Sequence, residues 1–174
     1  MPHINFEFKA HSQHIELLED KLLELNPEFI GIDNQTDTYF NVPKGRLKLR
    51  EGNIENALIY YERKNIEGAK QSDIILYKHQ PAKSLKDILI KVNGIKVIVN
   101  KTRKIYFIKN VKFHFDHVEG LGNFVEVEAI SNTGKTSIKK LKAQCEKYAE
   151  LFEIKESDYI SVSYSDLILD LLHG

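Results

Sequence analysis

The sequence contains no tryptophan and only one cysteine, Cys145, among its 174 residues. A single cysteine excludes an internal disulfide. Cys145 falls within a helical pattern, so we interpret it as a small buried apolar residue and not as a catalytic thiol.

Long apolar runs are also missing. No segment approaches the roughly 18 consecutive apolar residues that a membrane-spanning helix requires. The first residues, Met1 to Asn5, lack the order of a basic and then an apolar region that is typical of a signal peptide. We therefore expect a cytoplasmic protein with no membrane partner.

An excess of charge of either sign is absent, because 25 basic residues balance 25 acidic ones. No overall field favours DNA or an acidic membrane, and we expect no nucleic-acid partner. The length is close to that of one domain, and no low-complexity segment or long linker divides the chain. The sequence therefore predicts a single domain over residues 1–174.

Three segments have the periodicity of amphipathic helices. They are predicted over residues 12–25, from a cap at Ser84 to Gly94, and over residues 136–152. In the second helix the apolar residues are expected to face inward, and these are Leu85, Ile88, Leu89 and Val92.

Six further segments alternate between apolar and charged residues with a period of two, which is typical of strands. They cover residues 4–9, 46–50, 58–63, 97–103, 111–116 and 124–130. Such alternation usually means an antiparallel sheet with its charged face in water. Here, however, the charges are dense and sorted by sign. If the sheet closes, the charged faces form a polar tunnel.

The chemistry of these faces indicates a ligand. Arg46, Lys48 and Arg50 follow one another along one strand, and arginine and lysine on rigid strands match a polyphosphate. Glu126 and Glu128 are paired carboxylates, which suit Mg²⁺ or Mn²⁺ shared with phosphate groups. His114 shares an inward face with Asp116, and it is open whether it makes a structural hydrogen bond or a substrate contact.

At these positions the sequence resembles the CYTH superfamily, also called triphosphate tunnel metalloenzymes. Asn5-Phe6-Glu7-Phe8-Lys9 resembles the family's E-x-E-x-K opening. The blocks that follow occur in the family's order and are Gln35 to Phe40, Gly45 to Arg50, Tyr61 to Arg63, Lys101 to Arg103 and His114 to Glu128. The C-terminal third is most similar to the bacterial class IV adenylyl cyclases.

The resemblance implies an α+β fold, in which a closed eight-stranded antiparallel β-barrel forms a triphosphate tunnel with flanking helices. The catalytic and metal-binding residues that it implies are Glu7, Glu126, Glu128 and Asp116. The triphosphate-binding residues that it implies are Lys9, Arg46, Lys48, Arg50, Arg63, Lys101, Arg103 and Lys112. Asn5 departs from the motif, because it replaces the first acid and supplies no charge. This change bears on whether one metal ion or two are held.

The implied function is that of a metal-dependent enzyme acting on a small triphosphate, in the first place a cyclase that converts ATP to cyclic AMP and pyrophosphate. A triphosphatase acting on thiamine triphosphate, inorganic triphosphate or a nucleotide is the alternative, and a non-catalytic nucleotide-binding or polyphosphate-binding protein is a third. The absence of tryptophan modestly disfavours thiamine triphosphate, because its ring would need tyrosine or phenylalanine for a cation–π contact. The resemblance also allows for a homodimer.

Overall fold

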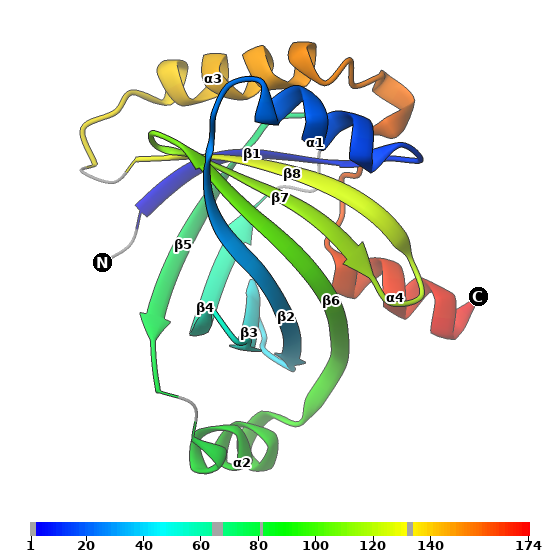
Figure 1. Cartoon of the computed structure of the whole chain (residues 1–174). Coiled ribbons are helices and arrows are strands. Elements are labelled where there is room, and N and C mark those ends of the chain that lie inside the picture. Colours follow the sequence, from blue (N-terminus) through cyan, green and yellow to red (C-terminus); the bar gives the residue numbers. More distant parts are fainter. Residues whose placement is uncertain (1–2, 64–67, 81, 132–133) are drawn as a thin grey trace.

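The chain folds around a closed antiparallel β-barrel (Figure 1). The computed structural model describes residues 3–63, 68–80, 82–131 and 134–174, without the side chains of His3 and Arg63. Around the barrel the strands follow the order β1-β5-β4-β3-β2-β6-β7-β8. The strands are β1 (His3–His11), β2 (Glu28–Phe40), β3 (Arg46–Glu51), β4 (Asn56–Arg63), β5 (Lys70–Lys78), β6 (Ile95–Ile108), β7 (Val111–Val118) and β8 (Gly122–Ile130). The helices are α1 (Ile15–Leu23), α2 (Lys83–Asn93), α3 (Ile138–Leu151) and α4 (Tyr164–His173). The predicted fold class is therefore confirmed.

A main apolar core lies outside the barrel wall, between strands β1, β7 and β8 and helices α1 and α3. Phe8, Phe113 and Val127 point outward into this core, where Leu141 and Cys145 of α3 are fully buried. Figure 1 shows α3 lying across β1. Because neighbouring residues of a strand point to opposite faces, the alternate polar side chains must face the barrel interior. The interpretation of Cys145 as a buried apolar residue is confirmed.

Helix α4, which the periodicity analysis did not predict, packs against the barrel through a second apolar cluster. The ring of Tyr164 contacts that of Phe124 with centroids 5.1 Å apart. The side chain of Ser163 caps the helix by accepting a hydrogen bond from the backbone N–H of Asp166. Asp166 in turn accepts a hydrogen bond from Arg46 at 2.7 Å. These contacts fix α4 to strands β3 and β8.

Helix α2 differs from its prediction in two ways. Its N-cap is Ala82 and not Ser84, which lies within the first turn, and no side chain caps it. Its apolar side does not face a core, since no residue of α2 is buried and Ile88 and Val92 are 59% and 74% exposed. Figure 1 shows the reason, because α2 lies beyond one end of the barrel, where it joins β5 to β6. The predicted end at Gly94 is confirmed, with the positive φ of 73° that glycine tolerates.

The other two predicted helices are shorter than expected, since α1 and α3 begin two or three residues later than predicted and end sooner. Strands β2 and β5 were not found by alternation. Within the described ranges, no helix has the length and apolar character needed to cross a membrane.

Candidate functional site

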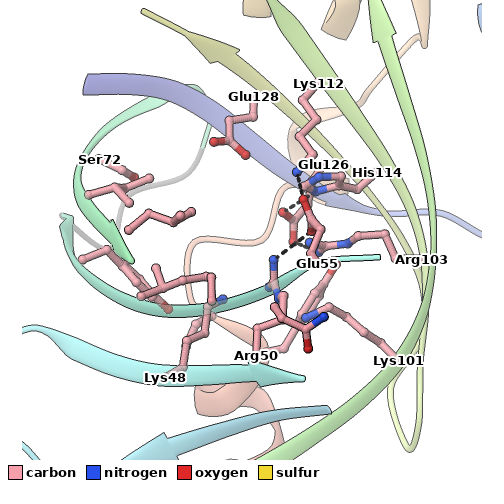
Figure 2. Close-up of a pocket in the computed structure, with 18 of the residues that line it drawn as sticks. Lys48, Arg50, Glu55, Ser72, Lys101, Arg103, Lys112, His114, Glu126 and Glu128 are labelled. Carbon is pink, nitrogen blue, oxygen red and sulfur yellow. Dashed lines mark hydrogen bonds and ion pairs between the residues drawn. The ribbon is translucent and has the colours of Figure 1, made fainter. Parts of the chain in front are cut away.

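A cavity of about 650 Å³ occupies the barrel interior. Its charged lining residues are Glu7, Lys9, Lys48, Arg50, Glu55, Lys78, Lys101, Arg103, Lys112, Glu126 and Glu128. Figure 2 shows side chains from separate strands converging there. The polar interior expected from the alternating strands is therefore present.

Asp37 of β2 gathers three bases around one buried carboxylate. Arg50 donates to both of its oxygens, at 2.9 Å and 2.8 Å, and Lys101 donates to Oδ2 at 2.7 Å. Lys48 lies 3.4 Å from the same oxygen. Although burial opposes ionisation, these three cations hold the pKa of Asp37 well below its usual value. One carboxylate thus positions three bases and leaves an excess of positive charge beside the cavity.

Lys101 is the most perturbed of these bases. Burial lowers its pKa to about 7, and the cations Arg103, Arg50 and Lys48 act in the same direction against the attraction of Asp37. A lysine with this pKa changes its charge near neutral pH, so its ionisation responds to an anion in the cavity.

Asp116 of β7 fixes Arg103 on the neighbouring strand β6. Arg103 donates from Nε and Nη2 to the two carboxylate oxygens, both at 2.7 Å. The hydroxyl of Tyr164 also donates to Asp116 at 2.8 Å. Since Asp116 is buried and does not line the cavity, its position supports a role in holding Arg103. Its predicted role as a metal ligand stays a prediction.

Glu126 of β8 lies among positive groups. Lys9 is 3.9 Å away, Arg103 is 3.5 Å away, and Nδ1 of His114 is 3.3 Å from Oε2. Burial opposes ionisation, but Arg103 and Lys9 hold the pKa of Glu126 well below its ordinary value. Lys9 also lies 3.9 Å from the centroid of the Tyr164 ring. Glu126 is therefore an ionised carboxylate that links two phosphate-binding candidates.

His114 makes the structural hydrogen bond and also lines the cavity. Burial and the nearby Arg103 lower its pKa to about 4, so the imidazole is neutral at pH 7. Its Nε2 is buried and has no hydrogen-bond partner in the part of the chain that the structure describes. The structural hydrogen bond of His114 is therefore present, and its contact with a substrate stays a prediction.

Glu55, which the sequence analysis missed, enters the cavity from the turn between β3 and β4. It pairs with Lys112 and with Arg50, the latter at 3.3 Å, and these partners hold its pKa below the ordinary value against burial. Asp33 fixes the turn by accepting hydrogen bonds from the backbone N–H groups of Ile54 and Glu55 at 2.9 Å and 3.0 Å. Glu55 lies outside any alternating pattern because a turn presents it, so periodicity carried no signal for it.

Glu7 and Glu128 face each other on β1 and β8 as directly paired residues. Burial and the facing Glu7 raise the pKa of Glu128 to about 7. Asn5 donates its side-chain amide to Glu128, and Ser72 donates to Glu7 at 3.2 Å. Asn5 therefore supplies a donor to this pair where a third carboxylate would add to the repulsion. In Figure 2 Glu128 lies away from the cluster that contains Glu55 and Glu126.

Most but not all of the predicted site residues meet in the cavity. Those that line it are Glu7, Lys9, Lys48, Arg50, Lys101, Arg103, Lys112, Glu126 and Glu128. Arg46 is directed to Asp166 of α4, and the side chain of Arg63 lies outside the described residues. The remaining side chains of β4 depart from the predicted charged inner face, because Ala57, Ile59 and Tyr61 line the cavity. Among the described residues, no three acidic, histidine or cysteine side chains form a ready metal site.

The fold is a closed barrel that carries bases and carboxylates on its inner wall. The sequence comparison assigns the family, since a model of the CYTH domain matches residues 3–164 and the chain therefore belongs to the CYTH family. Among curated proteins, none matches this sequence.

Solved structures share the fold over nearly their whole length. The PH1012 protein of Pyrococcus horikoshii OT3 is 25% identical, with a TM-score of 0.76 over 94% of this chain and 98% of that protein. A proposed adenylate cyclase of Vibrio parahaemolyticus is 16% identical, with a TM-score of 0.78 over 95% and 98% of the two chains. A Hippeastrum protein, proposed as an adenylyl cyclase and described with a dominant triphosphatase activity, is 14% identical, with a TM-score of 0.66 over 99% and 96%. The last two likenesses show the fold alone.

Proposed function

We propose that the chain is a divalent-metal-dependent enzyme that binds a triphosphate-bearing substrate inside the barrel and converts ATP to cyclic AMP and pyrophosphate. The observation that carries the proposal is the sharing of Asp37 by Arg50, Lys101 and Lys48. This arrangement holds three bases in place and leaves positive charge that an anion can neutralise. Membership of the CYTH family supports the broader part of this proposal, an enzyme that acts on a triphosphate-bearing substrate.

The bases would act by position and charge. Arginine binds phosphate oxygens in two-point contacts, and lysine provides a compact charge. Because Asp37 and Asp116 fix Arg50, Lys101 and Arg103 before substrate arrives, little reorganisation is needed when charge develops on the phosphate oxygens. Arg103 also reaches toward Glu126, which connects the phosphate-binding bases to the acidic wall.

The Glu7 and Glu128 pair fits a divalent cation. Two partly buried carboxylates face each other there, and desolvation together with the facing Glu7 raises the pKa of Glu128. Mg²⁺ commonly takes one or two protein carboxylates and completes its coordination with water and substrate phosphates, so a complete set of protein ligands is not required. We assign Mg²⁺ or Mn²⁺ to Glu7 and Glu128, with Glu126 as a further candidate ligand. The ion would polarise phosphate oxygens and neutralise their charge.

Hydrolysis of a triphosphate is the second candidate reaction. The Hippeastrum protein has this fold, and its described dominant activity is that of a triphosphatase. The same bases and the same cation would assist either reaction. In hydrolysis, water attacks the terminal phosphorus, whereas in cyclisation the ribose 3′ oxygen attacks the α-phosphorus.

Phosphorus NMR distinguishes the products. The protein is incubated with Mg²⁺ or Mn²⁺ and, separately, with ATP, thiamine triphosphate and inorganic triphosphate. Cyclic AMP with pyrophosphate supports the cyclase, and orthophosphate with a diphosphate supports the triphosphatase. Protection from heat by a triphosphate that is never consumed would show a binding protein and overturn the enzymatic proposal.

Matched variants test the site. Glu126→Ala and Glu128→Ala should each abolish metal-dependent turnover while the barrel remains folded. Glu119→Ala removes an exposed carboxylate from the β7–β8 turn and should leave turnover unchanged. Full activity in both cavity variants would refute the assignment of the acidic residues.

A further inference from the structure

One carboxylate of the cavity, that of Glu55, occupies donors that a phosphate group would also use. Its Oε2 pairs with Lys112. Its Oε1 accepts hydrogen bonds from Nη1 of Arg50 at 3.3 Å and from Nε2 of Gln35 at 3.0 Å. Figure 2 shows Glu55 between Arg50 and Lys112. Two cations and an amide therefore converge on one anionic group, an arrangement that suits phosphate oxygens equally well.

Most of the guanidinium of Arg50 is already taken by a second carboxylate. Asp37 accepts from Nε and Nη2 of Arg50 at 2.9 Å and 2.8 Å. This leaves Nη1 as the guanidinium nitrogen that Asp37 does not contact, and Nη1 is the atom that donates to Glu55. A phosphate oxygen that binds Nη1 therefore competes with the Glu55 carboxylate.

Glu55 differs from the two carboxylates that hold bases from outside the cavity. The side chains of Asp37 and Asp116 are fully buried, stand on strands and do not line the cavity. The side chain of Glu55 lines the cavity, keeps 26% of its surface exposed and comes from the turn before β4. Asp37 and Asp116 are thus permanent partners of their bases, whereas Glu55 has room to turn away into water.

The backbone of this turn is held in place, so only the Glu55 side chain has to move. Asp33 accepts hydrogen bonds from the backbone N–H groups of Ile54 and Glu55. Asn53 donates its side-chain amide to the carbonyl of Ile32 at 3.0 Å. Rotation about side-chain bonds is fast compared with the movement of a loop. Exchange of Glu55 for a phosphate group therefore needs no rearrangement of the barrel.

We propose that Glu55 competes with a phosphate group of the ligand for Lys112 and Arg50, and that this competition sets how tightly the protein holds a polyphosphate. The inference rests on the proposed function, because it presumes that a polyphosphate binds among these bases. Binding of the phosphate turns the Glu55 carboxylate away from its two cations, and release of the product returns it. The competing carboxylate lowers the affinity for substrate and product alike, which favours release of a charged product such as pyrophosphate.

The chain offers matched variants for a test. Glu55→Gln removes the charge and keeps the shape of the side chain, and Glu55→Ala removes both. Glu51→Gln makes the same change of charge at the end of β3, where Glu51 pairs with Lys86 of α2 and does not line the cavity. Lys112→Met removes one of the two competed cations, alone and together with Glu55→Gln. Thermal unfolding verifies that each variant is folded.

Calorimetric titrations with inorganic triphosphate and with pyrophosphate, first in EDTA, measure the competition without metal-dependent turnover. We expect Glu55→Gln and Glu55→Ala to bind both anions at least about tenfold more tightly than the wild type, and Glu51→Gln to stay within about twofold of it. In the Lys112→Met background the gain from Glu55→Gln should shrink, because one of the competed cations is gone. Repetition with Mg²⁺ should strengthen binding by the same factor in the wild type and in Glu55→Gln.

The failures are distinguishable. Unchanged or weaker binding by Glu55→Gln would mean that Glu55 only positions Lys112 and Arg50, and an undiminished gain in the Lys112→Met background would mean a general effect of charge. Either result overturns the inference. It is also wrong if Mg²⁺ strengthens binding to the wild type but not to Glu55→Gln, because Glu55 would then be a metal ligand. If neither anion binds the wild type or any variant, with EDTA or with Mg²⁺, the proposed function itself fails.

Discussion

Replacing Glu128 with glutamine should stabilise the metal-free protein and at the same time remove its response to metal. In the folded protein burial and Glu7 raise the pKa of Glu128 from its ordinary value of 4.5 to about 7. The folded protein therefore holds a proton that the unfolded chain releases between these pH values. Stability must fall as the pH rises from 4.5 to 7 and stay reduced above 7.

The size of the effect follows from the same shift. Ionised Glu128 costs about 3 kcal/mol of folding free energy at pH 8 and about 1 kcal/mol at pH 5.5. Glutamine carries no charge and keeps an oxygen that can accept the hydrogen bond from Asn5. Without metal, Glu128→Gln should raise Tm by about 5–10 °C at pH 8, by less at pH 5.5 and by almost nothing at pH 4.5.

Metal should reverse the order of thermal stability of the wild type and Glu128→Gln. Mn²⁺ or Mg²⁺ bound between Glu7 and Glu128 would raise the Tm of the wild type at pH 8, whereas the glutamine variant should show little shift. Scanning calorimetry with and without metal measures both effects, and Glu119→Gln serves as the exposed control. A glutamine variant less stable than the wild type at pH 8 without metal would refute the argument that the two carboxylates repel each other.

Other predictions follow from the buried groups. Asp37→Asn should lower the free energy of unfolding by about 3–5 kcal/mol in denaturant titrations, because its cations lose their shared partner, and unchanged stability would contradict the network. Triphosphate affinity should fall by up to about tenfold per pH unit above 7 as Lys101 loses its proton, and Lys101→Arg should flatten this profile in calorimetry at pH 6 to 9. Tyr164→Phe should lower the free energy of unfolding by about 1 kcal/mol in denaturant titrations, because it removes the hydrogen bond to Asp116. An unchanged free energy would mean that Arg103 alone is enough to hold Asp116. Because burial raises the pKa of the Cys145 thiol to about 12, a thiol reagent should label it only at the rate of unfolding, and rapid labelling of the native protein would contradict its burial.

On strand β1 the period of two predicted the two faces correctly. Phe6 and Phe8 of β1 are buried in the outer core, while Glu7 and Lys9 line the cavity, because the pleat of a strand leaves no other arrangement once one face is covered. The bases of β3 and the acids of β8 were found for the same reason. The closure of the sheet into a barrel was predicted from the resemblance to a family and not from the alternation.

What the pattern missed depends on tertiary contacts. Asp37 lies on the same face of β2 as Gln35 and Tyr39. The residues on the other face are also polar at this point, so the sequence does not alternate between apolar and polar residues and the strand was missed. Strand β5 combines inward Ser72, Ile74 and Leu76 with outward Ile75, so its two faces look alike in sequence. Helix α2 shows the reverse error, because a clear apolar stripe does not guarantee that the fold supplies a surface to cover it.

The ion pairs beside the cavity also join the barrel's strands. Asp37 of β2 connects to Arg50 of β3 and Lys101 of β6, and Asp116 of β7 connects to Arg103 of β6. The side chains that would neutralise a substrate therefore also hold neighbouring strands of the barrel together. Loss of activity after substitution at one of these positions cannot by itself be assigned to chemistry, because the same change loosens the barrel. The converse also holds, since a relative that had lost its reaction would still be under pressure to keep these charges.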